Sequence, residues 1–203
     1  MLLFRHINSV FLSFLLYLFK VDNETFRRKM EEIYMAELIF LDENEPFPNN
    51  ALPVLYYENV LESVFGEDFS GDDVLDLFKR NGYVGGWKGG ILDQHHFHSI
   101  AHEALACTVG ELRVQLGGPD GRIFTVRKGD VLLLPAGVAH KKLDATEEHE
   151  IIGAYPLNDS EYDMQYGDAD NYEAIKESIA NVAMPHTDPV TGSPSHIEEY
   201  WNN

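Results

Sequence analysis

Four of the nine histidines in this 203-residue chain lie between His95 and His102. Side chains two residues apart on a β-strand share a face, so His96 and His98 are expected to point together, with His95 pointing the other way. Glu103 follows closely and is expected to reach the same interior face from the start of the next strand. Imidazole and carboxylate groups are ligands of divalent transition metals, so this cluster predicts a metal site.

A fourth candidate ligand, His140, lies much further along the chain. It follows Pro135 and Gly137, whose Pro-x-Gly turn is expected to aim a side chain inward from a second hairpin. Three neutral imidazoles and one carboxylate leave a divalent ion with one net positive charge and with open coordination positions. This donor set suits Fe, Mn, Ni, Cu or Zn and does not select among them.

The elements that must position these ligands form a β-rich region. Between residues 82 and 156, short apolar or alternating runs are interrupted by glycine roughly every eight to twelve residues, which is typical of an all-β barrel or sandwich. Outside this region we expect strands at 36–41 and 52–60, helices at 72–80 and 170–181, and coil from Pro185 onward.

Two spaced motifs in this region resemble those of the cupin family. The first is Gly90-x5-His96-x-His98-x4-Glu103-x6-Gly110, and the second is Gly129-x5-Pro135-x-Gly137-x2-His140. Asp144 stands where the family usually has Asn, at a position with a structural role rather than a ligand role. Further similarity to the YjlB-like single-cupin subfamily covers residues 50–201, about three quarters of the chain. It includes His102, Ala154-Tyr155-Pro156, Asp163-Met164-x-Tyr166-Gly167, Asp188-Pro189-Val190 and Trp201.

This resemblance implies a cupin jelly-roll β-barrel, all-β with a few peripheral helices. It implies a single domain over residues 36–203 with its motif core at 82–156. The ligands implied are His96, His98, Glu103 and His140 around one divalent transition metal ion, with Fe or Mn favoured over Ni, Cu or Zn. Pairing of exposed strand edges in such proteins also implies a homodimer.

Two functional hypotheses fit this ligand set. The first is a metal-dependent enzyme, a dioxygenase or an isomerase acting on a small molecule, in which Glu103 is a ligand or a catalytic base. The alternative is a non-catalytic binding or sensor module whose metal only holds the barrel or a ligand. The ligand set does not separate these hypotheses, because both retain it.

Three neighbouring residues are candidates for supporting roles. His102 is expected at the surface or beside the site, where it could orient a ligand by a hydrogen bond. Cys107 follows Glu103 by four residues on the same face, so it is expected to line the barrel as an inert buried thiol. Trp87 is expected in the core or in the wall of a pocket.

The composition restricts partners and compartment. A formal charge of −19 repels phosphate backbones, so nucleic acid is not an expected partner. The lone cysteine excludes an intramolecular disulfide and fits a reducing compartment, so we expect a cytoplasmic protein.

The segment 1–35 is set apart from the predicted domain. Its apolar run at 10–19 resembles a signal peptide, but no small-x-small cleavage site follows it. The run is also about half as long as a membrane-spanning helix requires. It therefore represents a mis-called start or dispensable extension, a membrane anchor or a secretion signal.

A chain that begins at Met35 is expected to fold as the full chain does, because no barrel motif lies before that residue. The two proteins should have the same melting temperature and the same metal content, measured by scanning calorimetry and elemental analysis. Aggregation of the shortened chain, or a melting temperature several degrees lower, would show that the segment contributes to the fold.

Overall fold

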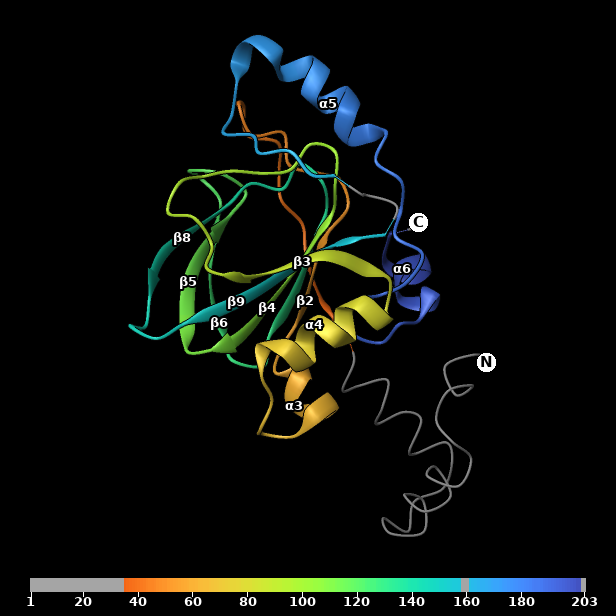
Figure 1. Ribbon diagram of the computed structural model, residues 1–203. Helices are drawn as coiled ribbons and strands as arrows, with labels where there is room; N and C mark the ends of the chain where they lie inside the picture. The colour runs from red at the N-terminus through yellow and green to blue at the C-terminus, as the bar shows by residue number, and fades with distance from the viewer. Residues whose placement is uncertain (1–34, 158–160, 202–203) are drawn as a thin grey trace. The chain divides into compact units, whose positions relative to one another are not determined.

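Antiparallel strands in two sheets form the core of the computed structural model, which describes residues 35–157 and 161–201. The larger sheet has the order β1 (Glu37–Ile39), β2 (Val54–Tyr57), β7 (Val131–Leu134), β4 (Glu103–Val109), β9 (Glu150–Pro156) and β3 (Tyr83–Gly89). The smaller sheet has the order β6 (Arg122–Arg127), β5 (Glu111–Leu116) and β8 (His140–Ala145). The predicted all-β jelly roll with peripheral helices is therefore confirmed (Figure 1).

The alternation of side chains along β4 builds the core between the sheets. Leu105 and Cys107 face inward and pack in one buried cluster with Leu112 and Val114 of β5. Residues of opposite parity, such as Ala106, point to the outer face and are also buried. Burying a leucine side chain contributes about 2 kcal/mol, so this double burial makes β4 a rigid support for Glu103 at its first position.

Helices cover the outside of the barrel. They are α3 (Val60–Phe65), α4 (Gly71–Arg80), α5 (Tyr172–Ala180), preceded by a 3-10 turn at Ala169–Asn171, and α6 (Pro194–Trp201). A capping box between Ser70 and Asp73 begins α4, and the helix packs against β3 and β9 (Figure 1). The helices expected at 72–80 and 170–181 are thus present with small shifts at their ends.

Two local expectations were wrong. The strand expected at 52–60 ends at Tyr57, and Val60 begins α3. The C-terminal tail was expected to be coil, yet it forms α6 and packs on the barrel through the buried Trp201, whose indole N–H donates to the Pro53 carbonyl at 2.9 Å. The proline and glycine residues of this tail predicted coil, because the local pattern does not report the tertiary contacts that order the helix.

The remaining organisation is simple. Ala36–Asn203 forms one compact unit, whereas the apolar run at 10–19 lies outside the described residues. Across 35–157 and 161–201, each helix is too short or too polar to cross a bilayer.

Candidate metal centre

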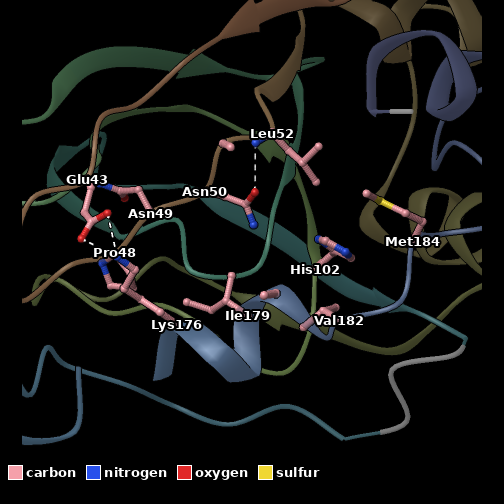
Figure 2. Close-up of a pocket in the computed structure, with 12 residues that line it drawn as sticks. Glu43, Pro48, Asn49, Asn50, Leu52, His102, Lys176, Ile179, Val182 and Met184 are labelled. Atoms are coloured by element: carbon pink, nitrogen blue, oxygen red, sulfur yellow. Dashed lines mark hydrogen bonds and ion pairs between the residues drawn. The ribbon is translucent and has the colours of Figure 1, made fainter. Parts of the chain in front are cut away.

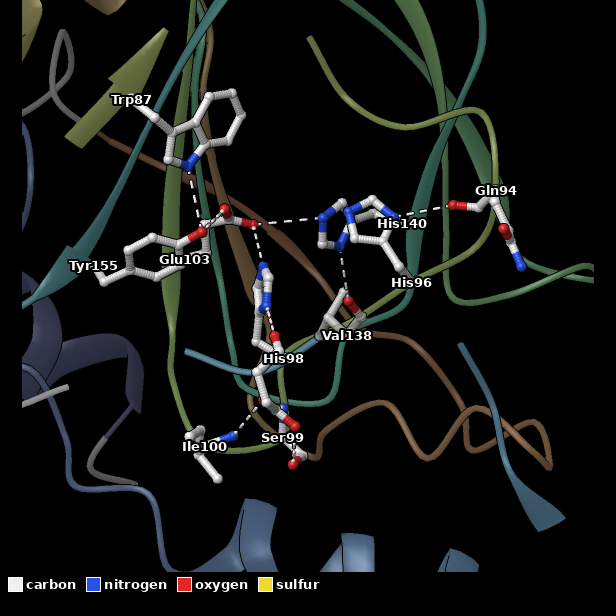
Figure 3. A network of polar contacts seen from close by, with 11 residues as sticks. Trp87, Gln94, His96, His98, Ser99, Ile100, Glu103, Val138, His140 and Tyr155 are labelled. Atoms are coloured by element: carbon white, nitrogen blue, oxygen red, sulfur yellow. Dashed lines mark hydrogen bonds and ion pairs between the residues drawn. The ribbon is translucent and has the colours of Figure 1, made fainter. Parts of the chain in front are cut away.

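Three of the predicted ligands meet at one point inside the barrel. The ligand atoms of His98, Glu103 and His140 all lie within 4.8 Å of one another, and all three side chains are buried. Glu103 Oε2 lies 3.3 Å from His98 Nε2 and 3.4 Å from His140 Nε2 (Figure 3). Two ligands that each lie about 2.1 Å from one ion at tetrahedral or octahedral angles are separated by about 3.0–3.4 Å, so these spacings suit a shared ion.

The backbone brings the two sequence motifs together. His96 and His140 form an antiparallel bridge in which each N–H donates to the other's carbonyl, at 3.2 and 2.9 Å. The Pro-x-Gly turn is fastened to the first motif by the Gly137 N–H, which donates to the His98 carbonyl at 2.8 Å. Gly137 has φ of +87°, and a Cβ there would lie 2.5 Å from the Asn49 carbonyl oxygen, so glycine is required.

Each of the three histidine rings is oriented by a hydrogen bond from its Nδ1 to a main-chain carbonyl. Nδ1 of His96 donates to the Gln94 carbonyl at 2.9 Å, and Nδ1 of His140 donates to the Val138 carbonyl at 3.0 Å. His98 Nδ1 donates in the same way to the carbonyl of Asp163. A carbonyl can only accept, so each Nδ1 carries the hydrogen. In the neutral ring, Nε2 is then the free ligand atom, which is the arrangement seen in metal-binding histidines.

The charges of the cluster fit a bound cation. Glu103 Oε2 is buried and accepts no hydrogen bond from the described residues. Burial lowers the pKa of His140 to about 3, so its Nε2 presents a lone pair to the carboxylate oxygen. Burial also lowers the pKa of His98, but the Glu103 carboxylate outweighs this and raises it overall. A proton on His98 would satisfy only one of the two contacts, whereas a divalent ion held by all three side chains satisfies both.

His96, the fourth predicted ligand, lies beside this cluster rather than within it. Its ring is buried and its centroid is 4.1 Å from that of His140, and it lines the same cavity. Its nitrogens lie outside the group whose ligand atoms all fall within 4.8 Å of one another. Ligation by His96 therefore stays a prediction.

Sequence reasoning did not assign a role to Tyr155, which holds Glu103. The Tyr155 hydroxyl donates to Glu103 Oε1 at 3.0 Å and accepts from the Trp87 indole N–H at 3.2 Å (Figure 3). These bonds fix one carboxylate oxygen and leave Oε2 for the histidines. Only the register of β4 with β9 places Tyr155 beside Glu103, and no local sequence signal reports that register.

Trp87 reaches this position because its neighbour on β9 has no side chain. Trp87 is paired with Gly153 across β3 and β9, and a Cβ on Gly153 would lie 2.1 Å from the indole ring. Trp87 was expected either in the core or in a pocket wall, and the structure places it in both. It packs against the core and lines the cavity above the cluster.

A segment near residue 163 forms part of the cavity wall. Tyr162 stacks on Tyr155 with ring centroids 4.3 Å apart, and its ring also meets the His98 ring edge-on. The Asp163 carboxylate accepts from the Ser99 N–H at 2.7 Å and from the Ser99 hydroxyl at 2.6 Å. The cavity enclosed in this way has a volume of about 190 Å³.

The other two predicted supporting residues lie away from the ligand atoms. His102 is buried, and its Nδ1 accepts from the Ala136 N–H at 3.0 Å, so it supports the turn that leads to His140. Burial lowers its pKa to about 4, and it lines a separate cavity of about 360 Å³ (Figure 2). Cys107 lies in the core, where burial raises the pKa of its thiol to about 12 and makes it inert.

A jelly roll of antiparallel strands, with two histidines and a glutamate converging from two motifs, defines a cupin. The chain is 31% identical over 167 residues to the Bacillus subtilis (strain 168) protein YjlB, which is described as uncharacterized, with 82% of this chain and 96% of YjlB covered. The chain belongs to the YjlB-like family of cupins. A comparison with protein-family models gave no match.

Solved cupin structures are similar over part of the chain. The QdtA 3,4-ketoisomerase of Thermoanaerobacterium thermosaccharolyticum has a TM-score of 0.35 and 22% identity, over 45% of this chain and 70% of QdtA. The Bacillus subtilis oxalate decarboxylase, a protein with Mn(II) centres, has a TM-score of 0.34 and 20% identity, over 62% of this chain and 30% of the decarboxylase. Pumpkin seed globulin has a TM-score of 0.31 and 24% identity, over 39% of this chain and 22% of the globulin.

Purified protein is expected to carry close to one transition metal ion per chain. His98→Ala and His140→Ala should each reduce this content strongly, because each removes one of the converging ligand atoms. His186→Ala, at an exposed position, is the control. His96→Ala tests the predicted fourth ligand in the same measurement. Elemental analysis that finds no metal, even after reconstitution with Fe, Mn, Ni and Zn, would refute the site.

Tyr155→Phe removes the hydroxyl that holds Glu103 Oε1 and is expected to weaken Mn or Zn binding about 10-fold. The matched control is Tyr162→Phe, which removes a hydroxyl from the ring stacked on Tyr155. Competition with a chelator of known affinity measures both variants. Equal metal affinity in the two variants would show that Tyr155 only packs against the site.

Proposed function

We propose that this protein is a metal-dependent enzyme that acts on a small molecule able to chelate through two oxygens. The observation that carries the proposal is the position of the His98, Glu103 and His140 cluster in the lining of a cavity of about 190 Å³. A metal that only held the barrel together would need no adjoining space. Cavities for drug-sized ligands usually measure about 300–1,000 Å³, so this one suits a smaller molecule.

The surrounding side chains support such a role in two ways. Apolar groups such as Ile91 and Leu105 line the cavity and limit water, which strengthens every electrostatic interaction inside it. A divalent ion, when bound, would act as a Lewis acid that stabilises negative charge developing on a substrate oxygen. The hydrogen bond from Tyr155 holds Glu103 in one orientation, which supports the ligand role of Glu103 over its predicted role as a catalytic base.

The proposal leads to a test that separates an oxygen-using enzyme from an isomerase. The protein is loaded with Fe(II) without oxygen and mixed with β-diketones, α-hydroxyketones, catechols and small thiols, while the absorption spectrum is followed. Air is then admitted and oxygen consumption is measured. A dioxygenase should consume oxygen only with chelating compounds and only when His98 and His140 are intact. An isomerase should turn over without oxygen and with Zn in place of Fe.

The controls decide between the enzyme and a binding module. His186→Ala should behave as the parent does in every measurement, because this exposed side chain lies outside the cluster. If compounds change the spectrum but none is converted, whichever metal is loaded, the enzyme is refuted and the binding or sensor module is favoured.

A further inference from the structure

The walls of the cavity differ in chemistry from the metal cluster of His98, Glu103 and His140 that lies at one side of it. The walls are built from large apolar and aromatic side chains, namely Trp87, Ile91, Leu92, Leu105, Tyr162 and Met164. None of the described residues that line the cavity is a lysine or an arginine. A cation to pair with a second charge on the substrate is therefore missing from this lining.

The polar groups of the wall nearest to Glu103 are already engaged. The Trp87 indole N–H donates to the Tyr155 hydroxyl, and that hydroxyl donates to Glu103. His96 also lines the cavity, and its Nδ1 is held by the Gln94 carbonyl. Beyond the metal cluster, the described wall offers a substrate mainly apolar contact.

Size sets a second limit. The cavity measures about 190 Å³, below the roughly 300–1,000 Å³ of cavities for drug-sized ligands, so the whole substrate must be small. A chelating head group takes part of this space, and the remainder must lie against Leu105, Ile91 and the indole. Three of these wall residues, Leu92, Tyr162 and Met164, are partly exposed and form the rim of the cavity.

We propose that the substrate has one chelating, monoanionic head group and a short apolar or aryl tail. This inference rests on the enzyme proposed above and names the class of molecule that its site accepts. Dicarboxylates and sugar nucleotides are disfavoured, because a second carboxylate or a diphosphate would lie against the apolar wall without a counter-charge. Burying an unpaired charge carries a large penalty, so we expect such compounds to bind at least about 10-fold more weakly.

The test uses two acids that differ only in the tail. Both 4-methyl-2-oxopentanoate and 2-oxoglutarate chelate through the same 2-oxo acid group, but the first ends in a branched alkyl group and the second in a carboxylate. Calorimetric titration into the full chain loaded with Zn, which is redox-inert, should give at least about 10-fold tighter binding for the alkyl acid. Equal binding, or tighter binding of 2-oxoglutarate, would overturn the inference and leave the proposed function standing.

A variant pair tests the wall itself. Met164→Lys places a cation at the cavity rim and should raise the affinity for 2-oxoglutarate at least about 5-fold. The control is Met184→Lys, because Met184 is 37% exposed against 39% for Met164 and lines the separate cavity of Figure 2. An unchanged preference in Met164→Lys, with melting temperature and Zn content intact, would contradict the inference. Failure of both acids to bind the Zn-loaded parent would instead refute the chelating substrate of the proposed function, and the inference with it.

Discussion

The burial of one carboxylate, that of Glu103, is the constraint on which the rest of this structure depends. A carboxylate removed from water is costly unless every oxygen is satisfied. Tyr155 satisfies one oxygen through a hydrogen bond, and the other faces the Nε2 atoms of His98 and His140. Those nitrogens cannot both donate, since burial keeps His140 neutral. The fold thus prepares a position that a cation stabilises, and the chemistry of the site begins from this electrostatic requirement.

The barrel meets this requirement by dividing the work among elements that are distant in sequence. The first residue of β4 supplies the carboxylate, the first residue of β8 supplies His140, and β9 supplies the supporting tyrosine. Each histidine is oriented through its Nδ1 by a carbonyl of the main chain. Because main-chain carbonyls are fixed by the fold, the ring orientations do not rely on further side chains. The site is therefore preorganised to the extent that the backbone is rigid.

The parts of the site that the sequence predicted are those determined by spacing along one strand or turn. The first motif brings His98 to the cluster although His96 and Phe97 form only isolated bridges, and the Pro-x-Gly turn with glycine at 137 leads to His140. Tyr155 depends on the register of two strands far apart in sequence, and Trp87 depends on the missing side chain at Gly153. Neither register nor a pairing with glycine can be derived from local periodicity. The tail helix α6 was not predicted for the same reason, since it contacts a residue more than a hundred positions away.

The contacts of Asp163 link two processes that are usually treated as separate. Its carbonyl orients the ring of His98, its carboxylate accepts from Ser99, and the residues on either side of it line the cavity. A displacement of this residue that widened the cavity would also release the imidazole from its orientation. We therefore expect the passage of small molecules and the exchange of a bound ion to be coupled through this one residue.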